Sequence, residues 1–113
     1  MASNPAIVFY PEKVTIYSGA WTPDTGTETL SSVAVTLYDN QWAVAGGISS
    51  LAATGFDNLA SAAPTAWFDF DPVARTVSQP TPATGQAIYT LRFVATDSNG
   101  KRYASDVLLV LKP

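Results

Sequence analysis

Side chains that could carry out catalysis are few in this sequence of 113 residues. It contains no His and no Cys, which removes the Ser-His-Asp and Cys-His nucleophile systems and the usual ligands of zinc and copper. Asp69 and Asp71 form the best-spaced carboxylate pair, because residues two apart on a strand share a face at about 7 Å. That distance would suit an inverting glycosidase. A single strand beside a turn rarely forms a cleft, however, so we expect no catalytic residue and a non-enzymatic protein.

The same oxygen atoms could bind a hard cation instead. Asp69 with Asp71, and Asp97 with Asn99, are the candidate ligands for calcium, which prefers carboxylate and carbonyl oxygens. The chain has no Asp-x-Asn-Asp linker and no second repeat that would complete the coordination shell. We therefore expect these side chains to cap turns or face solvent, and we expect no bound metal and no cofactor.

Aromatic residues are the other chemical signal, with three Trp, five Tyr and five Phe in the chain. Trp21 lies in a turn-rich stretch, where it would either plug the end of the core or present a ligand platform. Trp42 follows the turn signal at Asp39. An exposed Trp at either position could anchor a protein interface or stack on a sugar ring.

The charge pattern argues against two classes of partner. Charged residues make up 13% of the chain, roughly half the usual share of about 25%. The net charge is −3 and the six basic residues are scattered, whereas nucleic-acid binding requires a dense positive patch. There is no apolar run of about 18 residues and no charged-then-apolar leader, so we expect neither a membrane span nor an export signal.

These residues must be positioned by strands, and the clearest elements are near the C-terminus. Tyr89, Leu91, Phe93 and Ala95 alternate with more polar residues, as expected of a strand with one buried face. The sequence Asp-Ser-Asn-Gly ending at Gly100 then predicts a tight turn and an antiparallel return strand. This hairpin is the structural centre of the predicted fold.

The rest of the chain adds further short strands and turns. Strands are predicted at Lys13–Tyr17, Val33–Tyr38, Trp42–Gly47, Ala66–Pro72 and Val73–Ser78, with Phe68 and Phe70 pointing inward. From Ile48 to Ala63 the apolar residues recur at helical spacing, which predicts one short helix or turn with Asp57 as its N-cap and Pro64 as its stop. Seven to nine strands without alternating helices predict an all-β antiparallel sandwich.

Two apolar segments near the ends of the chain require cover. Residues 1–12 contain Ile7 to Tyr10 between prolines, and they form either the first strand of the domain or an arm that docks on a neighbouring subunit. Residues 13–113 form a single domain. The last strand, Val107–Leu111, is apolar on both faces, so a loop, the N-terminal segment or another subunit must cover its second face. The candidate interface residues are Ile7, Val8, Phe9, Tyr10, Trp21, Trp42, Leu108 and Val110.

Two segments of the C-terminal half carry recurring motifs. Their residues are Trp67, Phe70, Asp71, Pro72, Arg75, Thr76 and Ser78, followed by Tyr89, Thr90, Ala95, Thr96, Asp97, Ser98 and Gly100. In this pattern the chain from about Pro64 to Leu111 resembles the immunoglobulin-like and cadherin-like repeats of bacterial and phage surface proteins. Gln79 stands where that family usually has Gly. The resemblance implies an immunoglobulin-like β-sandwich for the whole domain.

The leading functional hypothesis is a structural virion protein. It would be a capsid decoration or cement protein of a tailed bacteriophage, or a tail-associated protein, which binds and stabilises neighbouring subunits. Its partners would be the major capsid protein or copies of itself, and its location the capsid surface of the virion. The alternative is a module of a bacterial surface adhesin at the cell surface, or a carbohydrate-binding accessory domain with a glycan as partner.

Overall fold

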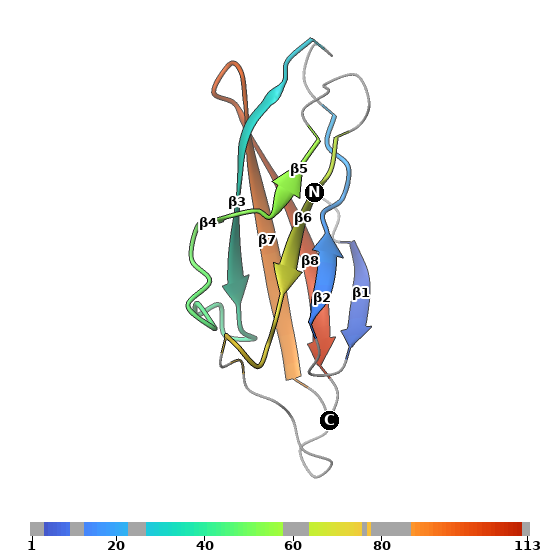
Figure 1. Ribbon diagram of the computed structural model, residues 1–113, viewed down its shortest axis with the longest axis vertical. Coiled ribbons are helices and arrows are strands. Elements are labelled where there is room, and N and C mark those ends of the chain that lie inside the picture. The colour runs from blue at the N-terminus through green and yellow to red at the C-terminus, as the bar shows by residue number, and fades with distance from the viewer. Residues whose placement is uncertain are drawn as a thin grey trace.

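Eight strands in two sheets make up the computed structural model (Figure 1). The structure describes residues 4–9, for which only the backbone is considered, and residues 13–22, 27–57, 64–75, 77 and 87–111. The strands are β1 (Asn4–Phe9), β2 (Val14–Tyr17), β3 (Leu30–Tyr38), β4 (Leu51–Ala52), β5 (Gly55–Phe56), β6 (Ala66–Phe70), β7 (Ala87–Asp97) and β8 (Arg102–Leu111).

The two sheets pack face to face as a sandwich. One sheet has the order β1-β8-β7-β3-β4 and the other the order β2-β6-β5. In Figure 1 the smaller sheet lies in front of the larger one, and the strands of both run along the long axis of the molecule. All strand pairs are antiparallel except β1 with β8. The predicted all-β sandwich is confirmed, and the number of described strands falls within the predicted range.

The hairpin of β7 and β8 is the longest paired element and forms as predicted. Its register places Arg92 opposite Asp106 and Tyr89 opposite Leu109. The tip closes where Gly100, at a φ of 83°, donates its backbone N–H to the carbonyl of Asp97 at 3.0 Å. Glycine suits this left-handed position because it has no Cβ to clash.

The core lies between the sheets and contains the residues that the alternation assigned to the inner face. Phe68 and Phe70 of β6 face the larger sheet, and both are buried. The other buried residues predicted from alternation are Val33, Val35, Leu37, Tyr89, Leu91, Phe93 and Ala95, and Val107, Leu109 and Leu111 of β8 are buried as well. Burial of this apolar surface supplies the main driving force for folding.

Two predicted strands are instead loops where the structure describes them, at residues 42–47 and at 73–75 with 77; residues 76 and 78 lie outside the described residues. Residues 42–47 join β3 only through an isolated bridge between Tyr38 and Val44, because Gly46 and Gly47 adopt φ values of 62° and 67° that interrupt an extended strand. Residues 72–75 form a turn. There the Asp71 carboxylate accepts hydrogen bonds from two following backbone amides, each at 3.1 Å.

The apolar residues from 48 to 57 recur at helical spacing, but this segment does not form a helix. This segment contains β4 and β5, which pair with β3 and β6. Short apolar runs at this spacing fit either a helix or a buried strand, and here cross-strand pairing decides. Residues 58–63, the body of the predicted helix, lie outside the described residues. The Asp57 carboxylate accepts hydrogen bonds from the backbone and hydroxyl of Thr65, at 3.4 and 3.2 Å.

The backbone of β1 runs parallel to β8 at the edge of the larger sheet. Ile7 pairs with Leu109 and Val8 with Val110. A neighbouring strand therefore occupies the open edge of the apolar last strand. Tyr10 lies outside the described residues.

Candidate interaction surface

The loop after β3 presents Trp42 to solvent. Its side chain is 58% exposed, and its φ is 60°. Asp39 holds the loop in this shape: one carboxylate oxygen accepts hydrogen bonds from the backbone of Gln41 and Ala43, at 2.8 and 3.0 Å. A positive φ is unfavourable for a bulky side chain. Glycine or Asn would fit this backbone with less strain, so the Trp42 side chain must act through its own contacts, either with neighbouring side chains or with a partner.

Trp42 belongs to a cluster on the outer face of the larger sheet, which we call the aromatic platform: Tyr38, Trp42, Arg92 and Asp106. The two rings lie 5.4 Å apart at an angle of 58°. The Arg92 guanidinium lies 5.6 Å from the Tyr38 ring and 5.5 Å from the Trp42 ring, within the range of cation–π attraction. It also forms two hydrogen bonds with Asp106, at 2.8 and 2.9 Å.

The bidentate pair fixes the orientation of the platform. The hydrogen bond to Asp106 raises the pKa of Arg92, with partial burial opposing it, and the nearby charge of Asp106 and the Tyr38 ring add to the rise. Arg92 therefore stays charged. Because the two side chains are 38% and 21% exposed, solvent screening limits the pair to at most about 1 kcal/mol of stability. Its main effect is to hold the guanidinium against the rings.

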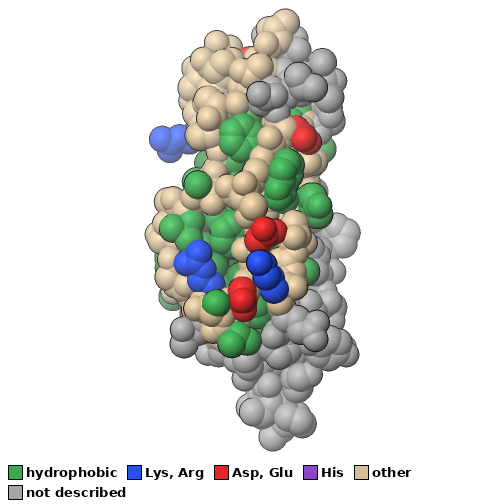
Figure 2. Space-filling view, in the orientation of Figure 1, with side chains coloured by type: hydrophobic (Ala, Val, Ile, Leu, Met, Phe, Trp, Pro, Cys, Tyr) green, Lys and Arg blue, Asp and Glu red, His purple; other side chains and the backbone are tan. Residues whose placement is uncertain are grey.

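A second aromatic pair lies on the outer face of the smaller sheet. Tyr17 is 59% exposed, and its ring lies 6.3 Å from that of Trp67. Trp67 in turn covers Gly55 on the neighbouring strand, where an added Cβ would approach the indole to 2.4 Å. Figure 2 shows this side of the molecule, with apolar side chains along its middle and acidic and basic side chains grouped below. Trp67 therefore shields a backbone position that glycine alone fits without displacing the indole.

Three other predicted interface residues, Trp21, Leu108 and Val110, are less accessible, and the side chains of residues 7–10 lie outside what the structure describes. Trp21 is 4% exposed, which agrees with the plug interpretation, and its indole N–H has no hydrogen-bond partner among the described residues. Leu108 and Val110 point outward from β8, as alternation requires; Leu108 is half-buried and Val110 is 9% exposed. Of the predicted Trp anchors, only Trp42 is on the surface.

The acidic candidates for calcium lie in separate places and already accept hydrogen bonds. Asp69, on β6, accepts one from the Thr15 hydroxyl at 2.7 Å, and Asp71 caps its turn. Asp97 and Asn99 lie at the hairpin tip of the other sheet. Within the described ranges, no group of three or more acidic residues gathers around one point. No described cluster thus offers a coordination shell.

Asp97 organises the hairpin tip and is itself buried. Its carboxylate accepts hydrogen bonds from the Tyr103 hydroxyl at 2.8 Å and from the backbone N–H groups of Asn99 and Lys101 at 2.8 and 2.9 Å. Burial raises the pKa of Asp97, but the hydrogen bonds from Tyr103, Lys101 and Asn99 outweigh it, so the pKa lies below its ordinary value. These contacts give Asp97 a structural role.

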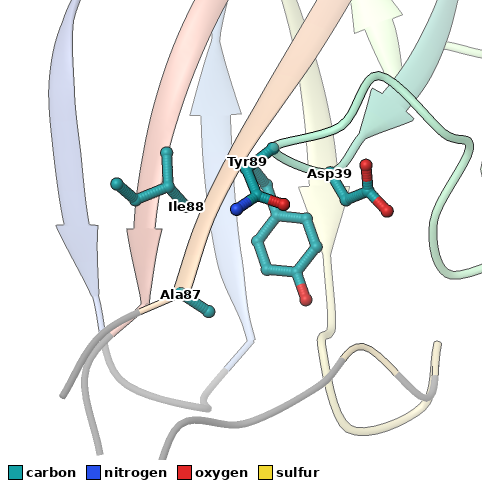
Figure 3. Close-up of a pocket in the computed structure, with 5 residues that line it drawn as sticks. Asp39, Ala87, Ile88 and Tyr89 are labelled. Atoms are coloured by element: carbon teal, nitrogen blue, oxygen red, sulfur yellow. The ribbon is translucent and has the colours of Figure 1, made fainter. Parts of the chain in front are cut away.

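A pocket of about 290 Å³ opens where the loop after β3 meets the start of β7. It is lined by Asp39, Asn40, Ala87, Ile88 and Tyr89 (Figure 3). Tyr89 points its ring toward the end of the sandwich, while Ile88 points to the other side of its strand. These five described residues include no nucleophile beside a general base.

Tyr38, Arg92 and Asp106 were not among the site residues predicted from the sequence. The pairing of Arg92 with Asp106 could have been predicted from the hairpin. If residues are paired outward from the turn at Gly100, Arg92 lies opposite Asp106 on the outer face. Tyr38 occupies an outer position of β3, two residues beyond Thr36, which pairs with Arg92.

Comparison with known proteins found no matching family model and no matching curated relative. Among the described residues, no helix is long and apolar enough to cross a membrane.

Proposed function

We propose that this protein is a non-enzymatic structural domain that binds a neighbouring protein subunit through the aromatic platform. The observation that carries the proposal is Trp42, which is exposed and held at an unfavourable φ. Trp, Tyr and Arg are the residues most enriched at the energetic centres of protein interfaces. The platform combines all three, and Arg92 is already oriented, which lowers the entropy lost on binding.

The particular role we propose is that of a virion protein. It would decorate or cement the capsid of a tailed bacteriophage, or belong to its tail, and bridge shell subunits or copies of itself. The resemblance of the C-terminal half to immunoglobulin-like repeats supports this role. So does the low content of charged residues, 13%, because a weakly charged surface repels a close neighbour less.

The second candidate is a module of a bacterial surface adhesin, or an accessory domain that binds carbohydrate. The exposed aromatic rings of Trp42 and Tyr17 favour it, since such rings also stack on sugars.

Gene neighbourhood and binding to shells distinguish these candidates. If the neighbouring genes encode a major capsid protein, shells assembled from that protein should bind the chain in a sedimentation assay. Trp42→Gly should weaken binding by about 30-fold or more, as loss of an interface hot spot does. Tyr17→Ala, on the opposite sheet, should leave binding unchanged. If wild-type protein does not sediment with the shells, or if both variants bind equally well, the proposed contact is wrong.

A further inference from the structure

A groove lies on the outer face of the larger sheet, next to the aromatic platform. Its volume is about 330 Å³. Residues of β3, β7 and β8 form most of it, and the loop before β4 adds one. The lining residues are Ser32, Ala34, Thr36, Ser50, Val94, Thr96 and Arg102.

Strand register fixes the order of these residues along the groove. Ser32, Thr96 and Arg102 lie side by side at one end, because Thr96 pairs with both of the others. Thr36 pairs with Arg92 at the other end, where the platform begins. From Ser32 to Tyr38 the outer face of β3 extends about 20 Å at the rise of an antiparallel strand. The groove and the platform therefore form one continuous track.

The polar groups of the groove are available to a ligand. The Arg102 side chain is exposed and forms no ion pair with a described carboxylate. The hydroxyl groups of Ser32, Ser50 and Thr96 form no hydrogen bond with another described side chain or backbone group. Among the four hydroxyl groups that line the groove, the Thr36 hydroxyl alone forms a hydrogen bond with a described group: it accepts one from the backbone N–H of Ser50 at 3.0 Å.

We infer that this groove binds a saccharide that carries a carboxylate. Arg102 would receive the carboxylate in a bidentate pair. The free hydroxyls are both donors and acceptors, as sugar hydroxyls are, and the exposed face of Trp42 at the far end of the track suits stacking on a sugar ring.

The position of the groove favours a sugar over a peptide. A peptide that adds to a sheet pairs its main chain with a free strand edge. The groove instead lies over β3 and β7, which pair with each other along their length; β7 also pairs with β8, and the two-residue β4 pairs with Ala34 and Val35 of β3. Side-chain hydroxyls, not main-chain groups, are therefore what the groove offers. This inference does not depend on the proposed contact with a protein shell.

Titration of the full chain with two trisaccharides tests the inference. Trigalacturonate carries carboxylates, and maltotriose is the neutral probe of the same length. We expect saturable shifts of backbone amide signals in β3 and β7 with trigalacturonate, and binding of maltotriose at least about tenfold weaker, because only the first can pair with Arg102.

Matched variants locate the binding. Arg102→Gln should weaken trigalacturonate binding by about tenfold or more, whereas Arg75→Gln, an equal loss of charge on an exposed turn of the other sheet, should leave it unchanged. No saturable binding of trigalacturonate, or equal losses in both variants, would overturn the inference. Tighter binding of a hexaglutamate peptide than of trigalacturonate would overturn it in favour of an acidic peptide. Shell binding should not respond to Arg102→Gln, so this test and that of the protein contact fail separately.

Discussion

Replacing Trp42 by Gly and by Ala provides the sharpest test of the strained platform. Both variants lose the contact with Arg92, about 0.5–1 kcal/mol at an exposed site, and the contact with the Tyr38 ring, about 0.5–1.5 kcal/mol. Alanine keeps the cost of a left-handed backbone, about 1–2 kcal/mol, and glycine does not. After allowing for the greater freedom of an unfolded glycine, Trp42→Gly should be more stable than Trp42→Ala by about 1 kcal/mol.

Urea unfolding with linear extrapolation measures this difference. The predicted gap corresponds to about 4 °C in Tm for a domain of this size. Ala43→Gly, one residue away, is the control: within the described ranges, positive φ at a residue other than glycine occurs only at Trp42 and Ser50. At an ordinary φ the change to glycine should destabilise by about 0.5–1 kcal/mol. If Trp42→Ala is as stable as Trp42→Gly, the backbone at this position is not strained, and the argument from strain to function fails.

Three further perturbations address other parts of the fold. Gly55→Ala should reduce the free energy of unfolding by about 1–3 kcal/mol, because the new methyl group meets the Trp67 indole; thermal unfolding at the wild-type midpoint would contradict this packing. Because the pKa of Asp97 lies below its ordinary 3.8, its stabilising effect should be complete above about pH 4 and lost as the pH falls through the lowered pKa. Asp97→Asn should remove that part of the acid dependence in urea titrations from pH 2 to 6, and an unchanged pH profile would count against it. A double-mutant cycle of Arg92→Ala and Asp106→Ala should give a coupling energy of up to about 1 kcal/mol that shrinks in 1 M salt; coupling that does not respond to salt would show that solvent does not screen the pair.

Much of the fold was predictable because strand alternation is a local property. Side chains of an extended chain point to opposite faces in turn, so the inner residues of β3, β6 and β7 followed from the order of apolar and polar residues. The predictions failed where a few side-chain and backbone bonds override that pattern. At Asp71 a carboxylate captures the next backbone amides, and around Gly46 the backbone leaves the extended region.

The candidate site was less predictable, for two different reasons. The pairing of Arg92 with Asp106 follows from the turn of a single hairpin, so the sequence contained it. The exposure of Trp42 and the burial of Trp21 did not follow from the sequence. Each residue lies in a loop, and the path of a loop depends on how the two sheets pack.

The sequence by itself determined an all-β chain, the inward residues of its longer strands and the hairpin that closes at Gly100. Those features depend on backbone geometry and on the conformational preferences of neighbouring residues. Only the tertiary structure brought Tyr38, Trp42 and Arg92 into mutual contact, and only it produced the groove that ends at Arg102. Such contacts join residues that are far apart in the chain, and the register of three strands and the shape of one loop must be set together before they form.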